Sequence, residues 1–334
     1  MRITGSSCML SMLLGLAVAA PAVPAVIGRD ATSYSREYLS SIVTQVLDSM
    51  VAHDPSTLPL ASVYQATENS HPAALSMMTS WRTIVEAGSP SLLAIDTING
   101  AAYFALDVSE GNNETEVILR GRVKVDNWKI TELELFINRN RGDHGFSFSA
   151  AELTANYKVL MSPPANRTKA SRETLQELSV ALFAESSNFS VTIGDDCQFT
   201  ELGWKVVDTG VYGNGSTTPL GCVWPDSHPT DTNARVGLVI DEELGFVVTS
   251  GMIPGTVYPY YGNLSAFIPD KMTSAQEAQE VWIDEVEAEG TQSLLSPTAG
   301  TGDTLEVLQY YNDELQGMQI NVYMSGPNMT SPWL

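Results

Sequence analysis

Cysteine and histidine, which often bind transition metals or act as nucleophile and base, are scarce in this chain. Its 334 residues include three cysteines and four histidines, and the histidines are scattered, with no H-E-x-x-H pair. The chain also lacks the G-x-S-x-G elbow, the G-x-x-x-x-G-K-[ST] phosphate loop and the G-x-G-x-x-G turn. These absences argue against a zinc hydrolase, a serine hydrolase and a nucleotide-dependent enzyme, so we expect neither a metal nor a cofactor.

Positive charge is scarce as well. Lysine and arginine together number 17, against 39 aspartates and glutamates, which gives a formal net charge of −22. Such a surface repels phosphate backbones and anionic lipids. We therefore expect no nucleic-acid partner and no membrane partner, whereas the charge alone indicates no substrate.

Hydrophobic runs long enough to cross a bilayer are also missing. The apolar run from Leu10 to Ala20 follows the basic residue Arg2 and precedes a small-residue stretch with Ala17-Val18-Ala19 as a cleavage choice. A spanning helix needs roughly 20 apolar residues, so this pattern favours a signal peptide over residues 1–25. The alternative is a buried N-terminal helix. We expect a protein that is secreted or enters the secretory pathway.

The few cysteines and the glycosylation sequons agree with secretion. Cys8 would leave with the signal peptide, so an oxidising compartment predicts a disulfide between Cys197 and Cys222. The rival interpretation, a catalytic thiol, has no supporting motif. Sequons of the form N-x-S/T occur at Asn113, Asn166, Asn188, Asn214, Asn263 and Asn328.

One pentapeptide pattern occurs twice, as SREYL at Ser35 and as SRETL at Ser171. After each serine the apolar residues recur with helical spacing, and the glutamate falls in the first turn, where the helix dipole favours a carboxylate. Each serine is a suitable N-cap. The two pentapeptides therefore predict the starts of two amphipathic helices.

Further echoes follow each predicted helix in the same order. The pattern Q-x-T-E ends at Glu68 and again at Glu201, the pair Ile-Asp ends at Asp96 and again at Asp241, and each half closes with a hairpin. We interpret this as an α+β fold of two tandem cone-shaped units, each a helix packed on a curved antiparallel sheet. The expected boundaries are residues 33–158 for the first unit, 159–170 for an exposed linker and 171–334 for the second unit.

The second half resembles a family of secreted fungal proteins with no assigned reaction. The likeness lies in PPANRTKASRETL at Pro163–Leu175, the pair Cys197 and Cys222, Arg235 with VIDEELG at Val239–Gly245, and SPW at Ser331–Trp333. A helix followed by a curved antiparallel sheet also resembles the nuclear transport factor 2-like fold, which ketosteroid isomerase shares. The resemblance implies a cofactor-independent isomerase, cyclase or dehydratase in fungal secondary metabolism, such as a dimerising cyclase.

In such a fold a carboxylate inside an apolar cavity acts as general base, because desolvation raises its pKa. The candidate catalytic residues are Glu68, Glu201, Tyr64 and Asp241, and the candidate substrate-binding residues are His228, Arg235 and Trp128. The expected substrate is a small apolar carbonyl compound.

Each candidate also has a structural interpretation. Glu68 and Glu201 are then solvent-facing strand residues or hold a turn, Asp241 belongs to a β-turn, and Arg235 pairs with a nearby carboxylate. His228 lies in a loop, and Trp128 belongs to the core or a cavity wall. The corresponding functional alternative is a non-catalytic secreted protein that binds a small apolar ligand, or an extracellular interaction protein. A homodimer is compatible with all of these.

Overall fold

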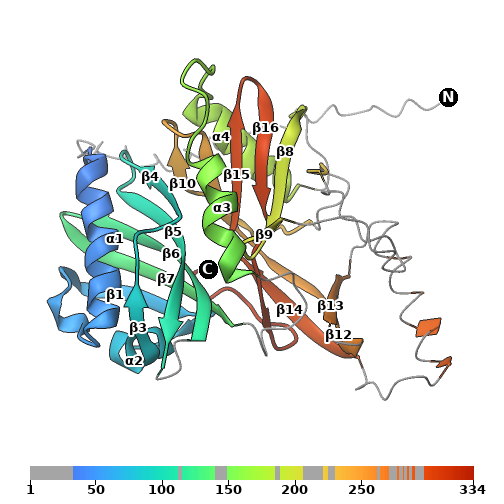
Figure 1. The fold of residues 1–334 in the computed structure, drawn as a ribbon, viewed down its shortest axis with the longest axis horizontal. Coiled ribbons are helices and arrows are strands. Elements are labelled where there is room, and N and C mark those ends of the chain that lie inside the picture. The colour runs from blue at the N-terminus through green and yellow to red at the C-terminus, as the bar shows by residue number, and fades with distance from the viewer. Residues whose placement is uncertain are drawn as a thin grey trace, which may run out of the picture. The chain divides into compact units, whose positions relative to one another are not determined.

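The computed structural model (Figure 1) describes residues 33–111, 115–139, 149–184, 189–205, 221–224, 230–261, 264–270 and 297–334, with isolated positions between 277 and 289. Ser33–Leu334 form one compact unit. The expected signal peptide lies outside the described residues. Among the helices that are described, none is long and apolar enough to cross a membrane.

The chain has an α+β fold in which most strand pairs are antiparallel. Its α-helices with described bounds are α1 (Arg36–Val51), α2 (Thr79–Thr83), α3 (Ala150–Leu160) and α4 (Arg172–Leu182), and two 3-10 turns are η1 (Pro55–Thr57) and η2 (Leu75–Met77). The strands before α3 are β1 (Leu60–Glu68), β2 (His71–Pro72), β3 (Ile84–Ala87), β4 (Leu92–Asp96), β5 (Ala101–Glu110), β6 (Thr115–Asp126) and β7 (Lys129–Arg139). The later strands are β8 (Ile193–Glu201), β9 (Trp204–Lys205), β10 (Arg235–Asp241), β11 (Phe246–Ser250), β12 (Met252–Tyr261), β13 (Leu264–Pro269), β14 (Thr298–Thr304), β15 (Glu306–Tyr311), β16 (Glu314–Gln319) and β17 (Val322–Ser325).

The two predicted helix starts are confirmed. The Ser35 side chain accepts a hydrogen bond from the backbone N–H of Tyr38 at the start of α1, and Ser171 accepts one from Thr174 at the start of α4. Both serines have extended backbone angles, as N-caps do. The repeated pentapeptide therefore begins a helix in each half of the chain.

The first two sheets repeat one strand order. In the first sheet β1 pairs in parallel with β7, and β7, β6, β5 and β4 follow by antiparallel pairing. In the second sheet β8 pairs in parallel with β16, and β16, β15, β11 and β10 follow by antiparallel pairing. A short antiparallel strand, β2 or β9, flanks β1 or β8. The two halves thus share both the helix start and the pairing order.

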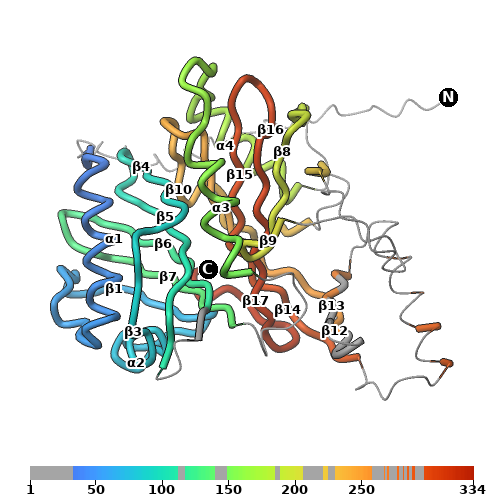
Figure 2. The backbone as a smooth tube through the Cα atoms, viewed as in Figure 1, coloured from blue at the N-terminus to red at the C-terminus, as the bar shows by residue number. Residues whose placement is uncertain are grey.

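The halves differ in how their long strands continue (Figure 2). Strands β5, β6 and β7 are uninterrupted, whereas the second half has the successive pairs β11 and β12, β14 and β15, and β16 and β17. The outer pieces of these pairs, β12, β14 and β17, form a third sheet together with β13, in the order β13-β12-β14-β17. The shared strand order does not by itself establish the cone shape or the tandem duplication, so both stay predictions.

A hydrophobic core fills the space between α1 and the first sheet. Leu39, Ile42 and Val46 of α1 are at most 1% exposed and pack against strand residues such as Phe104 and Leu119. A second core joins α4 to the second sheet. Each amphipathic helix therefore buries the apolar stripe that its sequence predicts.

A third core lies between the two sheets. It contains Tyr103 and Phe136 of the first sheet, Phe246 and Val248 of the second, and Tyr157 of α3. Because strands β5 and β11 have side chains buried on both faces, they consist of near-continuous runs of buried residues. Helix α3 packs on this core, and the sequence analysis did not predict it.

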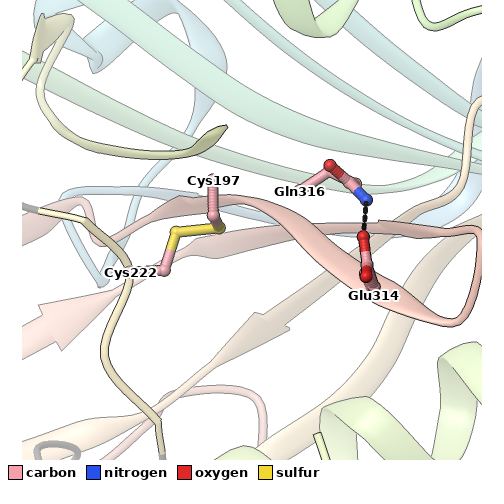
Figure 3. Close-up of a disulfide and its surroundings, with 4 residues drawn as sticks. All are labelled: Cys197, Cys222, Glu314 and Gln316. Atoms are coloured by element: carbon pink, nitrogen blue, oxygen red, sulfur yellow. Dashed lines mark hydrogen bonds between the residues drawn. A yellow bond between two sulfur atoms is a disulfide. The ribbon is translucent and has the colours of Figure 1, made fainter. Parts of the chain in front are cut away.

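The predicted disulfide is present (Figure 3). It joins Cys197 of β8 to Cys222 across a sequence separation of 25, and both cysteines are buried within the core of the second half. Glu314 and Gln316 lie on the neighbouring hairpin, where Gln316 Nε2 donates to Glu314 Oε2 over 3.3 Å. A cross-link closing a loop of this length stabilises a protein by about 3 kcal/mol in the chain-entropy model.

Candidate functional site

Asp241 is fully buried at the end of β10, and both of its carboxylate oxygens are occupied. Arg36 donates from Nη1 to Oδ1 over 2.8 Å and from Nη2 to Oδ2 over 2.9 Å. The backbone N–H of Ile95 donates to Oδ2, and those of Glu243 and Leu244 donate to Oδ1. The carboxylate is thereby tied to the first residue of α1 and to the end of β4.

Asp96 makes the equivalent contacts, with the two halves of the chain exchanged. Arg172 donates from Nη1 to Oδ1 over 3.0 Å and from Nη2 to Oδ2 over 2.6 Å, and the backbone N–H of Ile240 donates to Oδ2. The loop after β4 adds three bonds, from the backbone N–H groups of Ile98 and Asn99 and from the Asn99 amide. Each half of the chain therefore supplies the arginine for the other half's aspartate.

This reciprocal arrangement explains the repeated SR and ID patterns. Burial by itself would lower the pKa of Arg36, but the hydrogen bonds and negative charge of Asp241 outweigh burial and raise that pKa. A general base needs a carboxylate oxygen that faces a substrate, and both oxygens of Asp241 face protein donors. The geometry favours a structural role for Asp241 over the catalytic role expected from sequence.

Glu68 lies at the end of β1 and serves the start of α2. Its Oε1 accepts from the backbone N–H of Thr79 over 2.8 Å, and its Oε2 accepts from the N–H and Oγ of Ser80 over 2.8 and 2.7 Å. Helix α2 has no side-chain cap at its N-cap residue, Met78. Glu68 therefore takes the place of a local cap, which again favours structure over catalysis.

The other two catalytic candidates lie apart from Asp241. Tyr64 is half-buried on β1 and packs against the core beneath α1. Glu201 is half-buried at the end of β8, opposite Trp204 of β9. Neither residue lines the described cavity presented below, and the structure does not bring the four candidates together.

Trp128 is an exposed turn residue. It is 51% exposed, and its ring lies 4.6 Å from that of Tyr38 and 5.1 Å from that of Tyr34, measured between centroids. Asn127 and Trp128 have φ angles of 50° and 64°, as a two-residue hairpin turn requires. His228, the remaining substrate-binding candidate, lies outside the described residues.

Arg235 does take part in a buried polar cluster. Its Nη1 and Nη2 donate to the two oxygens of Glu134 over 3.1 and 2.5 Å, and Nη2 also donates to Ser250 over 2.8 Å. Glu134 lies on β7 of the first sheet and is 1% exposed. The pairing register of β10 shifts between Arg235 and Val239, where Gly237 has a φ of 60°. Such a bulge re-aims neighbouring side chains.

Two further cations on β6 extend this cluster. Arg122 lies opposite Glu134 and donates to it from Nε over 3.2 Å, while its Nη2 donates to Glu132 over 2.6 Å. Lys124 lies opposite Glu132, with Nζ 3.3 Å from Oε1. Burial by itself would raise the pKa of Glu132, but the nearby charges of Arg122 and Lys124 hold it below its usual value.

Trp333 lies over the two arginines. The guanidinium carbons of Arg122 and Arg235 are 5.3 and 5.5 Å from the centre of the Trp333 ring, within the range of cation–π attraction. Gln65 Nε2 donates to the carbonyl oxygen of Pro332 over 2.8 Å, which holds the segment against β1. The SPW sequence that carries the family resemblance is thus part of this site.

These residues line a cavity of about 460 Å³. Its lining residues are Gln65, Asn99, Ala101, Arg122, Lys124, Glu132, Arg235, Gly237, Leu238 and Trp333. They come from the first sheet, from β10 of the second and from the closing segment. The volume is within the range of small-molecule binding pockets, and this cavity is the candidate site.

A second buried polar cluster surrounds Arg120, which lies two residues before Arg122 on β6 and therefore on the same face of that strand. Its Nε donates to Asn138, its guanidinium carbon lies 4.5 Å above the Phe136 ring, and neither Nη has a partner in the described part of the chain. Burial lowers the pKa of Arg120 to about 10. Burial also raises the pKa of Asp303, whose Oδ2 accepts from Ser325, to about 6.

Two of the six predicted sequons fall on described residues. Asn166 and Asn328 are both exposed, as a glycosylation acceptor must be. Asn113, Asn188, Asn214 and Asn263 lie outside the described residues.

The sequence analysis missed most of the cavity. It named Arg235 and used Ser331–Trp333 only as a family likeness, but it did not single out Arg122, Lys124, Glu132 or Glu134. A signal was available, because R-G-R-V-K on β6 and E-L-E-L on β7 place charged residues alternately on one face. Alternation of this kind usually marks a solvent-facing side, whereas here the second half of the chain covers that face.

Comparison with known proteins gives no family. No family model matches the chain, and no curated protein matches it. Two solved structures are similar in part: a protein of unknown function with a cystatin-like fold from Methylobium petroleophilum, and a de novo designed protein with a curved β-sheet. The first has 16% identity over 33% of this chain and 82% of its own, with a TM-score of 0.28. The second has 15% identity over 31% and 88%, with a TM-score of 0.27. At these TM-scores neither likeness identifies the family.

Proposed function

We propose that this chain is a non-catalytic secreted protein that binds a small molecule, and that the ligand enters the cavity lined by Arg122, Arg235 and Trp333. The observation that carries the proposal is this cavity of about 460 Å³ with charged, amide and aromatic lining. In ligand sites, placed polar groups fix the orientation of the ligand and provide specificity. The proposed ligand is polar, in place of the apolar ligand expected from sequence.

The contacts of the expected catalytic residues support binding over catalysis. Both oxygens of Asp241 accept from Arg36 and from backbone donors, and both oxygens of Glu68 accept from the start of α2. Neither carboxylate lines the cavity. We therefore place the function in the cavity and assign these acids to the fold.

The fold proposed for this function is a pair of related nuclear transport factor 2-like units. Support comes from the shared strand order of the two sheets, the two capped helix starts and the reciprocal pairs Arg36–Asp241 and Arg172–Asp96. Secretion is supported by the buried disulfide, because such bonds persist in oxidising compartments.

The proposal is tested by screening a metabolite library for compounds that raise the melting temperature of the glycosylated protein, followed by native mass spectrometry of each hit. A ligand that binds only the folded state raises stability by mass action. We expect a one-to-one complex that Trp333→Ala weakens and that the exposed Trp128→Ala leaves intact. A library in which no compound binds, or hits that are insensitive to Trp333, would contradict the proposal.

A second candidate function is that of a cofactor-independent isomerase, with Asp303 as the general base. Burial raises the pKa of its carboxyl group to about 6, although hydrogen bonds from Ser325 and Ser70 act in the opposite direction. A carboxylate of that kind is suited to act as general base near neutral pH. The test is deuterium incorporation from D2O into a panel of small ketones: isomerase function requires enzyme-dependent exchange that Asp303→Asn abolishes.

A further inference from the structure

We infer that the ligand of this cavity is a small organic acid whose carboxylate lies against Arg122 and Lys124. The inference rests on the proposed binding function and names the chemical class of the ligand. It is carried by the charge of the lining, the unused hydrogen-bond donors and the apolar part of the lining.

The cavity lining reverses the charge of the whole chain. Three cations, Arg122, Lys124 and Arg235, line the cavity with one acid, Glu132, whereas the chain has a net charge of −22. Glu134 does not line the cavity but pairs with Arg122 and Arg235. Counting it as a second acid still leaves the cluster with one excess positive charge. In a strongly acidic protein, this excess makes the cavity a favourable place for an anion.

The carboxylate oxygens already present are all engaged. Glu132 accepts from Arg122 through Oε2 and lies against Lys124 through Oε1. Glu134 accepts from Arg235 through both oxygens and from Arg122 through Oε2. Neighbouring cations therefore offset the negative charge of both acids, and some hydrogen-bond donors of these cations stay unused.

Several donors are left over. The Arg122 side chain is 3% exposed, and its contacts to Glu132 and Glu134 use Nη2 and Nε, which leaves Nη1 without a bond to any described residue. Lys124 Nζ contacts Glu132 alone among the described residues and is 42% exposed. Arg235 Nε and Trp333 Nε1 are buried and have no hydrogen-bond partner among the residues that the structure describes. A site rich in N–H donors selects an acceptor-only group, and a carboxylate is such a group.

Part of the cavity lining is apolar. Ala101, Leu238 and the ring of Trp333 belong to it, and apart from the Trp333 indole N–H their side chains offer no hydrogen-bond donor to an inorganic anion. A flat apolar body could contact this apolar surface while an attached carboxylate faces the cations. This feature favours an organic acid over free phosphate, and benzoate is a suitable probe.

The experiment is isothermal titration calorimetry of the full-length secreted protein with benzoate, with its neutral isostere benzamide and with inorganic phosphate, at low ionic strength. We expect benzoate to bind, benzamide to bind at least about tenfold more weakly because it lacks the charge, and added salt to weaken benzoate binding. Lys124→Gln should weaken benzoate about tenfold and leave benzamide unchanged. Lys129→Gln, which removes an exposed lysine of the same hairpin outside the cavity, is the matched control.

The outcomes distinguish a failure of the organic-acid assignment from a failure of the proposed binding function. Benzamide binding as tightly as benzoate, or a library hit that is neutral and sensitive to Trp333, overturns the organic-acid assignment and leaves the binding function intact. Phosphate binding more tightly than benzoate replaces the organic acid with an inorganic oxyanion. Failure of every probe and of the whole metabolite library overturns both proposals.

Discussion

Single charged residues decide how this molecule holds together. Arg36 and Asp241 are 205 positions apart in the chain, yet they form a bidentate ion pair in which Asp241 is fully buried. Removing one partner of a buried pair leaves a charge without compensation, and this loss usually exceeds the net contribution of the intact pair. Mutations at this pair therefore report on the contact between the two halves.

Arg36→Ala should lower the free energy of unfolding by about 3 kcal/mol, because it leaves the Asp241 carboxylate buried and unpaired. The double variant Arg36→Ala/Asp241→Ala should lose less than the sum of the two single variants. Urea unfolding followed by circular dichroism measures all three, with the exposed Arg82→Ala as control. Additive losses in the double variant would show that the two side chains do not interact.

Asp303 should make stability depend on pH. Its pKa is raised to about 6 in the folded protein against a usual value of 3.8, so its favourable contribution is fully present below about pH 4 and is lost as the pH rises to 6. Asp303→Asn should therefore gain stability relative to the wild type between pH 4 and 6, by up to about 3 kcal/mol, and stay level above pH 6. Urea midpoints across this range provide the measurement. A stability difference between the variant and the wild type that does not change with pH would contradict the raised pKa of Asp303.

At the level of elements, short helices in this fold depend on side chains from distant strands. Helix α2 has five residues and no local cap, and Glu68 of β1 accepts the hydrogen bonds of its first N–H groups. Such a short helix is not stable on its own. Its position is set by this carboxylate and by the burial of Trp81 in the core beneath α1.

Glu68→Ala should cost about 1 to 2 kcal/mol of stability and speed amide exchange at Thr79 and Ser80, which lose their acceptor. Exchange rates at α1 should change little by comparison. The control is Glu86→Ala on the exposed side of β3. Unchanged protection at Thr79 and Ser80 would contradict the capping role.

The sequence predicted the two helix starts better than the contacts that their residues make. Ser35 and Ser171 could be identified because capping depends on neighbouring residues only. Arg36 and Arg172 could not be assigned partners, because each aspartate belongs to the other half of the chain. Helix α3 was overlooked, although Leu153, Tyr157 and Leu160 have helical spacing.

Most of the cavity could not be predicted from the sequence either, because its residues come together from distant parts of the chain. The alternation on β6 and β7 is compatible with Arg122 and Glu134 on one face, but it was not used to identify them, and a face with charged residues usually contacts water. The packing of β10 and of Trp333 against that face covers these charges. Arg235 was found through the resemblance and not through its chemistry.

At the scale of the whole molecule, a core between the two sheets joins the halves, flanked by the two arginine–aspartate pairs. The disulfide constrains the second half, whose sheet has the shorter strands. Folding should therefore be a single cooperative transition for the described part of the chain, with the disulfide adding stability to all of it.

Replacing Cys197 and Cys222 with serine should lower the free energy of unfolding by about 3 kcal/mol while keeping one unfolding transition. Differential scanning calorimetry of the variant against the oxidised wild type provides the measurement. Two separate transitions, with only one shifted, would show that the halves unfold independently.

The central claim, that a small molecule binds beside Trp333, is tested most directly by NMR of the tryptophan indole N–H groups. The chain has six tryptophans, and the signal missing from Trp333→Phe identifies Trp333. Addition of the ligand found in the library screen should shift this signal and leave that of the exposed Trp128 in place. A ligand that shifts other tryptophan signals but not that of Trp333 would contradict the account.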